Sequence, residues 1–125
     1  MKKILLFALF ILSITSCSST SKEESLKKLG EQTFDSKVWL NANEEKRGAM
    51  IYDFIKKNTP ITDKNREFII SQLGKSTGYY EYDHNLAYYI GPTPPSSNLK
   101  AYLIAFIIDH ENNKVKDIYI HPEIK

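Results

Sequence analysis

The spacing of hydrophobic and polar residues changes once along this chain, from a helical period to an alternating one. Apolar residues at helical spacing predict a helix over Glu44–Lys57, with Asn43 as the cap whose side chain accepts a backbone N–H of the first turn. A second helix is predicted to begin after Thr62 and to end at Leu73. Gly74 suits the left-handed position that commonly follows a helix.

The second half of the chain is rich in Tyr, Ile and Leu, as strands are. The predicted strands are Tyr79–Asp83, Leu86–Ile90, Leu99–Ile108 and Val115–His121. Consecutive strands usually pair, so we expect an α+β fold with two helices packed on one face of a four-stranded antiparallel meander sheet. The expected core consists of Met50, Phe54, Phe68, Leu73, Ile104, Phe106 and Ile118.

The third predicted strand is apolar on both faces. Ile104 and Phe106 alternate with Leu103 and Ala105. We assign the Ile104 side to the helices because Ile118 begins a matching bulky stripe on the next strand. The two predicted helices cover only one face of the sheet, so the Leu103 face needs the tether, a loop or a partner.

Tyrosine is concentrated in this half, with seven of the eight lying between Tyr79 and Tyr119. Two interpretations are open: cross-strand packing, or a surface for protein recognition to which tyrosine brings large, rigid contacts. The residues proposed to bind a protein partner are Tyr88, Tyr102, Leu103 and Tyr119. Tyr88 shares a side of its strand with Leu86, so it could instead point inward.

The N-terminus resembles a bacterial lipoprotein signal. Lys2 and Lys3 precede an apolar run that ends in Ile14-Thr15-Ser16-Cys17, and this run is too short to span a membrane. The resemblance implies cleavage before Cys17, acylation of its thiol and anchoring by fatty acyl chains. The alternative is an ordinary secretory signal with an incidental cysteine. Ser18 after the cysteine resembles a signal for the outer membrane rather than the inner one.

The predicted organisation is therefore a signal peptide at 1–16, an acylated cysteine with a flexible tether at 17–36, and one α+β domain at 37–125. Loss of Lys2 and Lys3 with the signal leaves 15 of the 17 Lys and Arg residues against 15 Asp and Glu, a net charge of zero. A neutral chain without a basic stripe argues against a nucleic-acid partner. The single cysteine leaves no intramolecular disulfide.

Candidate chemistry is sparse. His84 and His110 fall in turns that a meander places at the same end of the sheet, beside acidic residues, so a metal site is geometrically conceivable. Asp, His and Asn are also ordinary turn residues, and we predict no metal and no cofactor. Arg47 is expected to pin the sheet or the Trp39 segment, and Asp53 to pair with a lysine of its own helix. The chain has no catalytic triad order, phosphate-binding loop or HExxH motif, so no enzyme is predicted.

The chain also resembles the small outer-membrane assembly lipoproteins of the SmpA/OmlA (BamE) kind, whose fold is similar to β-lactamase-inhibitor protein repeats. The resemblance lies in Gln72-Leu73-Gly74, in Tyr82 or Tyr88, in Leu103-Ile104-Ala105-Phe106 and in Val115-Lys116-Asp117-Ile118. We therefore expect a lipid-anchored, periplasm-facing envelope protein that binds a protein or assists assembly without catalysis. The alternative is a periplasmic inhibitor or immunity lipoprotein. A third is an enzyme or metal-binding protein that uses the His84 end.

Overall fold

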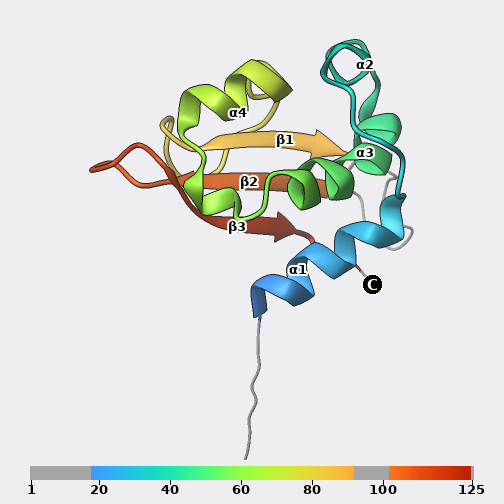
Figure 1. The fold of residues 1–125 in the computed structure, drawn as a ribbon, viewed down its shortest axis with the longest axis horizontal. Helices are drawn as coiled ribbons and strands as arrows, with labels where there is room; N and C mark the ends of the chain where they lie inside the picture. The colour runs from blue at the N-terminus through green and yellow to red at the C-terminus, as the bar shows by residue number, and fades with distance from the viewer. Residues whose placement is uncertain (1–17, 92–101, 125) are drawn as a thin grey trace, which may run out of the picture.

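The computed structural model describes residues 18–91 and 102–124, which form helices followed by a small antiparallel sheet (Figure 1). The helices are α1 (Ser18–Leu26), α2 (Ser36–Leu40), α3 (Glu44–Lys57) and α4 (Arg66–Leu73), and the 3₁₀ turns are η1 (Lys27–Leu29) and η2 (Ile61–Asp63). The strands are β1 (Leu86–Ile90), β2 (Tyr102–Ile108) and β3 (Val115–His121), paired in the order β1-β2-β3. The expected α+β class is confirmed, with a three-stranded meander.

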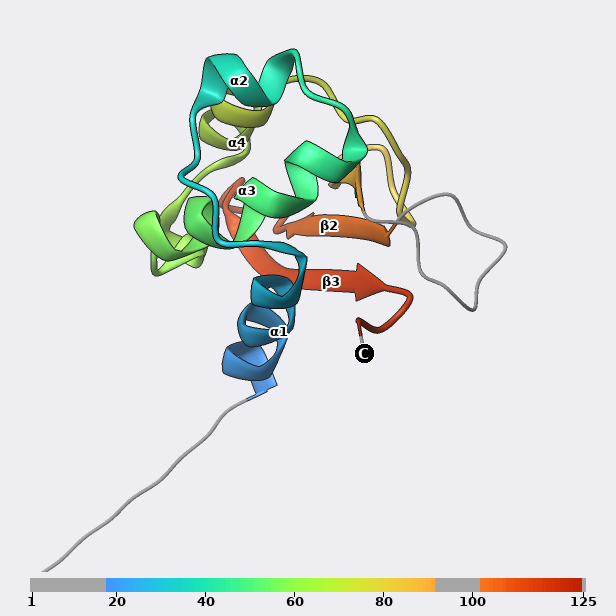
Figure 2. The ribbon, with the colours of Figure 1, turned by 90° about the vertical axis from the view of Figure 1, so that its right-hand side faces the viewer.

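The helices are not spread around the sheet. Figure 2 shows α2, α3 and α4 on one side of the strands, with α1 lying beside β3 at the edge of the sheet. Two helices on one face were expected, and the structure places three there and a fourth at an edge.

Both predicted helices are present, and one boundary differs. The helix Glu44–Lys57 is confirmed as α3, and the Asn43 side chain accepts the backbone N–H of Lys46 at 2.9 Å. The second helix begins at Arg66 rather than after Thr62, because Asn65 supplies the cap that accepts from a first-turn amide. Gly74 ends this helix with a φ of 79°, the positive value expected for it.

The predicted strand Tyr79–Asp83 is wrong. Glu81 has a φ of 61°, which interrupts an extended strand, and Asn85 holds the resulting loop together. The Asn85 side chain donates to the carbonyl oxygen of Tyr80 at 3.1 Å and accepts the backbone N–H of Ile108 at 2.9 Å. One hydrogen bond of the Asn85 side chain within the loop and one to β2 have overridden the strand preference of the tyrosines.

The other strands agree with their predictions. β1 and β3 have the predicted ends. β2 is described from Tyr102 to its predicted end at Ile108, and the predicted residues Leu99, Lys100 and Ala101 lie outside the described residues. In register, Ile104 lies opposite Tyr88 on one side and Ile120 on the other. A register shift between Ile107 and Ile108 marks a bulge in the pairing with β3.

The assignment of the core face is confirmed. Of the expected core, Phe68 alone is only partly buried, since Ile69 takes the fully buried position on α4. Phe106 lies at the centre, with its ring edge-on to Phe54 at 6.4 Å and to Tyr88 at 6.2 Å between centroids. The remaining expected core residues are buried: Met50, Phe54, Leu73, Ile104 and Ile118.

The segment predicted as a flexible tether is folded against the domain from Lys22 onward. Leu26, on α1, has no exposed surface and belongs to the core cluster. Burying a leucine side chain contributes about 1.5–3 kcal/mol, which offsets the ordering of a short polar helix. Gln32 continues the contact by donating its backbone N–H to the Ala49 carbonyl oxygen at 2.9 Å. The folded body therefore begins well before residue 37.

Helix α2 was not anticipated by the sequence. Asp35 caps it, and Trp39 on this helix is fully buried, donating its ring N–H to the Leu73 carbonyl oxygen at 2.8 Å. Arg47 lies over the Trp39 ring at 4.8 Å and donates to the Trp39 carbonyl oxygen at 2.9 Å, so it holds the Trp39 segment as expected. Asp53 pairs with Lys57 at 3.0 Å, also as expected.

Candidate functional site

The residues proposed for protein binding lie on opposite faces of the sheet. Tyr88 and Tyr102 point to the helices and are buried, with Tyr88 fully so. Leu103 and Tyr119 lie on the opposite face, where Leu103 is half-buried and Tyr119 is 36% exposed. Tyr88 and Tyr102 are therefore core residues, and only Leu103 and Tyr119 are placed where a partner could reach them.

Tyr88 is buried because its side chain follows the Ile104 face across the sheet. Its hydroxyl donates a hydrogen bond to the Gly74 carbonyl oxygen at 2.8 Å, at the end of α4. Burial raises the pKa of this phenol above its ordinary value, since the charged phenolate is disfavoured away from water. The hydrogen bond joins the sheet to the helix layer, which is a structural role.

A loop covers part of the face opposite the helices. This covering loop, residues 74–85, starts along the outer edge of β1, where the backbone N–H groups of Thr77 and Gly78 donate to the Ala87 carbonyl oxygen. Tyr80 then stacks on Tyr119, with ring centroids 4.5 Å apart. Ala87 and the neighbouring Ala105 are almost inaccessible as a result.

The part of this face that remains exposed is aromatic. Tyr89 is 40% exposed and lies across from Leu103, which in turn lies across from His121. The rings of Tyr119 and His121 are nearly parallel, at 8° and 6.2 Å between centroids. We call these residues, together with Tyr80, the aromatic face: Tyr80, Tyr89, Leu103, Tyr119 and His121.

Sequence reasoning missed Tyr80 and Tyr89 as members of this surface. Tyr80 was assigned to a strand that does not form, and it reaches Tyr119 only because the covering loop turns back over the sheet. Tyr89 follows Tyr88 directly, so strand alternation places it on the face opposite its neighbour. Strand alternation was the available signal: because Tyr88 points inward, Tyr89 points to the opposite face.

The two turn histidines do come together, as the meander predicted. The rings of His84 and His110 are stacked at 4.8 Å, and Tyr82 lies edge-on to His110 at 6.1 Å. Arg66 donates to the His84 carbonyl oxygen at 2.9 Å and holds this turn against α4. Within residues 18–91 and 102–124, no group of three or more His, Cys, Asp or Glu side chains is arranged to hold a metal ion.

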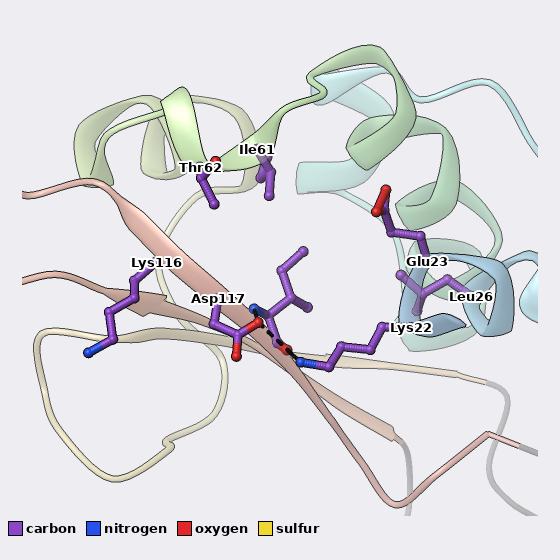
Figure 3. A pocket seen from close by; sticks show the side chains of 8 residues that line it. Lys22, Glu23, Leu26, Ile61, Thr62, Lys116 and Asp117 are labelled. Atoms are coloured by element: carbon purple, nitrogen blue, oxygen red, sulfur yellow. Dashed lines mark hydrogen bonds and ion pairs between the residues drawn. The ribbon is translucent and has the colours of Figure 1, made fainter. Parts of the chain in front are cut away.

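A small cavity of about 130 Å³ lies between α1, η2 and β3 (Figure 3). Leu26, Ile61 and Ile118 contribute its apolar lining. Lys22 spans one side, with its ammonium 3.1 Å from a carboxylate oxygen of Asp117 and 2.7 Å from the Ile118 carbonyl oxygen. Of the charged residues that line it, Lys22 and Asp117 pair with each other across the gap between α1 and β3.

The proposed lipid attachment residue, Cys17, lies outside the described residues. No helix in the described part of the chain is long and apolar enough to cross a membrane. Comparisons with protein-family models, with curated proteins and with solved structures find no match to this chain.

Proposed function

We propose that this chain is a lipid-anchored, non-catalytic envelope protein that binds another protein through the aromatic face. The observation that carries the proposal is the exposure of Tyr89 and Tyr119 on the face of the sheet opposite the buried Tyr88. Tyr89 is 40% exposed, and Tyr119 is 36% exposed although its ring stacks on Tyr80.

The chemistry of this face fits protein recognition better than catalysis. Tyrosine supplies a large contact area with few rotatable bonds and is enriched among residues that dominate binding energy. Leu103 is half-buried between Gly78 and Tyr89, so a partner would meet an apolar floor with a polar rim. Stacking of Tyr80 on Tyr119 holds these rings in place before binding.

Anchoring through Cys17 would leave this face free. Helix α1, which begins directly after Cys17, contacts β3, whereas the covering loop pairs with β1 at the other edge of the sheet. Support for the anchor itself comes from the sequence Ile14-Thr15-Ser16-Cys17. Cys17→Ser should release the chain from the membrane fraction after cell lysis, and retention of the variant in that fraction would contradict the anchor.

Site-specific photo-crosslinking in living cells tests the binding face. A photoreactive residue in place of Tyr89 should crosslink to a discrete protein, and an added Tyr119→Ala substitution should weaken that band because it removes the stacked ring. A photoreactive residue at Val38, which is 44% exposed on α2, is the matched control and should give no such band. An equal band from Val38, or one that ignores Tyr119→Ala, would place the contact elsewhere.

A further inference from the structure

The two edges of the sheet are closed in different ways. The edge of β1 is covered by the chain itself, since the Ala87 amide donates to the Ser76 hydroxyl at 2.9 Å and the Tyr89 amide donates to the Thr77 hydroxyl at 2.9 Å. The loop amides also donate to the Ala87 carbonyl oxygen, so the backbone groups of Ala87 and the amide of Tyr89 are not available to pair with another strand. Among the described residues, the contacts that occupy outward backbone groups of β3 between Asp117 and His121 come from side chains.

At the β3 edge, one side-chain pair occupies the backbone groups of Ile118. Its N–H donates to the Asp117 carboxylate at 2.8 Å, and its carbonyl oxygen accepts from the Lys22 ammonium at 2.7 Å. These groups therefore point away from β2. In an antiparallel ladder the outward groups recur at every second residue, so the amide and carbonyl of Ile120 also face outward.

The ion pair that occupies the backbone groups of Ile118 is weak. The Lys22 and Asp117 side chains are 35% and 58% exposed, and exposed ion pairs of this kind contribute about 1 kcal/mol or less. The cavity of about 130 Å³ between α1 and β3 shows that the helix does not pack tightly against the strand. Leu26 is the only residue of α1 in the buried core among those described.

We propose that the β3 edge from Asp117 to His121 is a strand-pairing site for a second copy of this chain, and that Lys22 on α1 closes it. An exposed edge strand is a ready template for another strand, and proteins commonly block such edges with a lysine. Pairing requires the Ile118 groups that Lys22 and Asp117 occupy, so these two side chains must release them before two copies associate.

The sequence of β3 favours self-pairing in one register. When Ile118 lies opposite Ile120 of the second copy, Asp117 lies opposite His121 of that copy, so a carboxylate faces an imidazole on each side of the axis. Tyr119 lies opposite its own equivalent at the axis. The contact is isologous, as closed dimers require, and the apolar residues Ile118 and Ile120 extend the core face of both sheets.

The paired segment is limited at both ends. The bulge in the β2–β3 pairing lies just before Asp117, and Pro122 after His121 has no N–H to donate. The interface is therefore a five-residue strand pair, and because the covered β1 edge offers no second pairing site, it makes a dimer and not a fibre. This proposal does not depend on the aromatic face binding a protein.

Disulfide trapping tests the register. In the proposed dimer the Tyr119 positions form a pair without ladder hydrogen bonds, with Cα atoms about 4.5 Å apart, within the range that a disulfide spans. We would purify the full chain in detergent with Cys17→Ser and Tyr119→Cys, oxidise it mildly and measure the disulfide-linked dimer. Tyr89→Cys is the control, because Tyr89 is similarly exposed on the same face but lies on β1.

Adding Lys22→Met should increase the Tyr119→Cys dimer by up to roughly fivefold for each edge that is opened, as expected from losing an interaction of about 1 kcal/mol or less that holds the edge closed. Lys22→Arg, which keeps the charge, should leave the yield near that of the parent. The molar mass of the Lys22→Met variant without Tyr119→Cys, measured by light scattering, should shift toward the dimer at concentrations where the parent is monomeric.

Two results would overturn the proposal. If the Tyr119→Cys yield equals the Tyr89→Cys yield in the presence of Lys22→Met, the β3 edges do not meet in this register. If the yield is high but unaffected by Lys22→Met, α1 does not close the edge. A dimer of Lys22→Met detected by light scattering without the Tyr119→Cys crosslink would place the contact on another surface and also refute the assigned register.

Discussion

Replacing Tyr88 with alanine should destabilise the protein far more than the same change at Tyr89, although the two are neighbours on β1. Tyr88 is fully buried, with its ring edge-on to Phe106 at 6.2 Å and to Trp39 at 6.1 Å. Tyr89 is 40% exposed on the opposite face. The pair tests which face of the sheet is the core.

The expected magnitudes follow from these contacts. Tyr88→Ala leaves a cavity under the helices and should reduce the free energy of unfolding by about 3–5 kcal/mol, as large-to-small changes of aromatic core residues do. Tyr88→Phe keeps the ring but leaves the Gly74 carbonyl oxygen without its donor, for a loss of about 1–2 kcal/mol. Tyr89→Ala should lose less than about 1 kcal/mol, because only cross-strand contacts at the surface are removed.

Equilibrium unfolding in urea measures all three changes. Trp39 is the only tryptophan and is buried beside Tyr88, so its fluorescence reports unfolding, and circular dichroism provides a second probe that does not depend on that ring. The assignment of the faces would be refuted if Tyr89→Ala lowered the free energy of unfolding as much as Tyr88→Ala does, or more. A stable Tyr88→Ala variant would show that the ring is not packed in the core.

The buried phenol of Tyr88 should also make the folded protein less stable at alkaline pH. Burial raises the pKa of its phenol in the folded state, so the stabilisation is present below the unfolded pKa of about 10 and is lost as the pH rises above it. The free energy of unfolding should therefore fall between pH 10 and 11 more steeply in the parent protein than in Tyr88→Phe. Equal pH slopes for the two proteins would mean that the Tyr88 hydroxyl ionises as readily in the folded chain as in the unfolded chain.

Further predictions concern the N-terminus, one helix and the histidines. Leu26→Ala should lower the free energy of unfolding by about 2–3 kcal/mol and Lys28→Ala by less than about 0.5 kcal/mol in urea titrations, whereas equal effects would mean that α1 is not docked. Gly48→Ala should lower the melting temperature despite its better helix propensity, because the added Cβ would overlap backbone that follows β1; a rise would contradict that close approach. A chelator should leave the melting temperature unchanged in the parent and in His84→Ala/His110→Ala, and a chelator-sensitive parent would reveal a metal.

Elements whose signals are local were predictable from the sequence. The helix Glu44–Lys57 combines an Asn cap, acidic residues in its first turn and one apolar stripe, so sequence and structure agree at both ends. The strands β1 and β3 are short Ile- and Tyr-rich runs bounded by turn residues, and their limits also agree. The meeting of His84 and His110 follows from the antiparallel pairing of β1 with β2, because His84 lies just before β1 and His110 just after β2, and these two ends lie at the same end of the sheet.

The candidate site depended on information that no local signal carried. Both faces of β2 are apolar, so alternation assigned Ile104 and Phe106 to one face together but could not show that a loop covers the other. The Tyr79–Asp83 segment has strand-forming residues, yet Asn85 bonds to Tyr80 within the loop and accepts the Ile108 amide of β2, a contact that exists only after folding.

The sequence by itself determined the α+β class, the main helix, two strands and the pairing of Asp53 with its own helix. Only the tertiary structure decided that Leu26 is core rather than tether, that Tyr88 is buried while Tyr89 is exposed, and that Lys22 reaches the β3 edge. The physical reason is that periodicity records which residues share a face of an element, whereas burial depends on what packs against that face. For this chain the packing partners are a short polar helix and an irregular loop, and neither has a periodic pattern to reveal it.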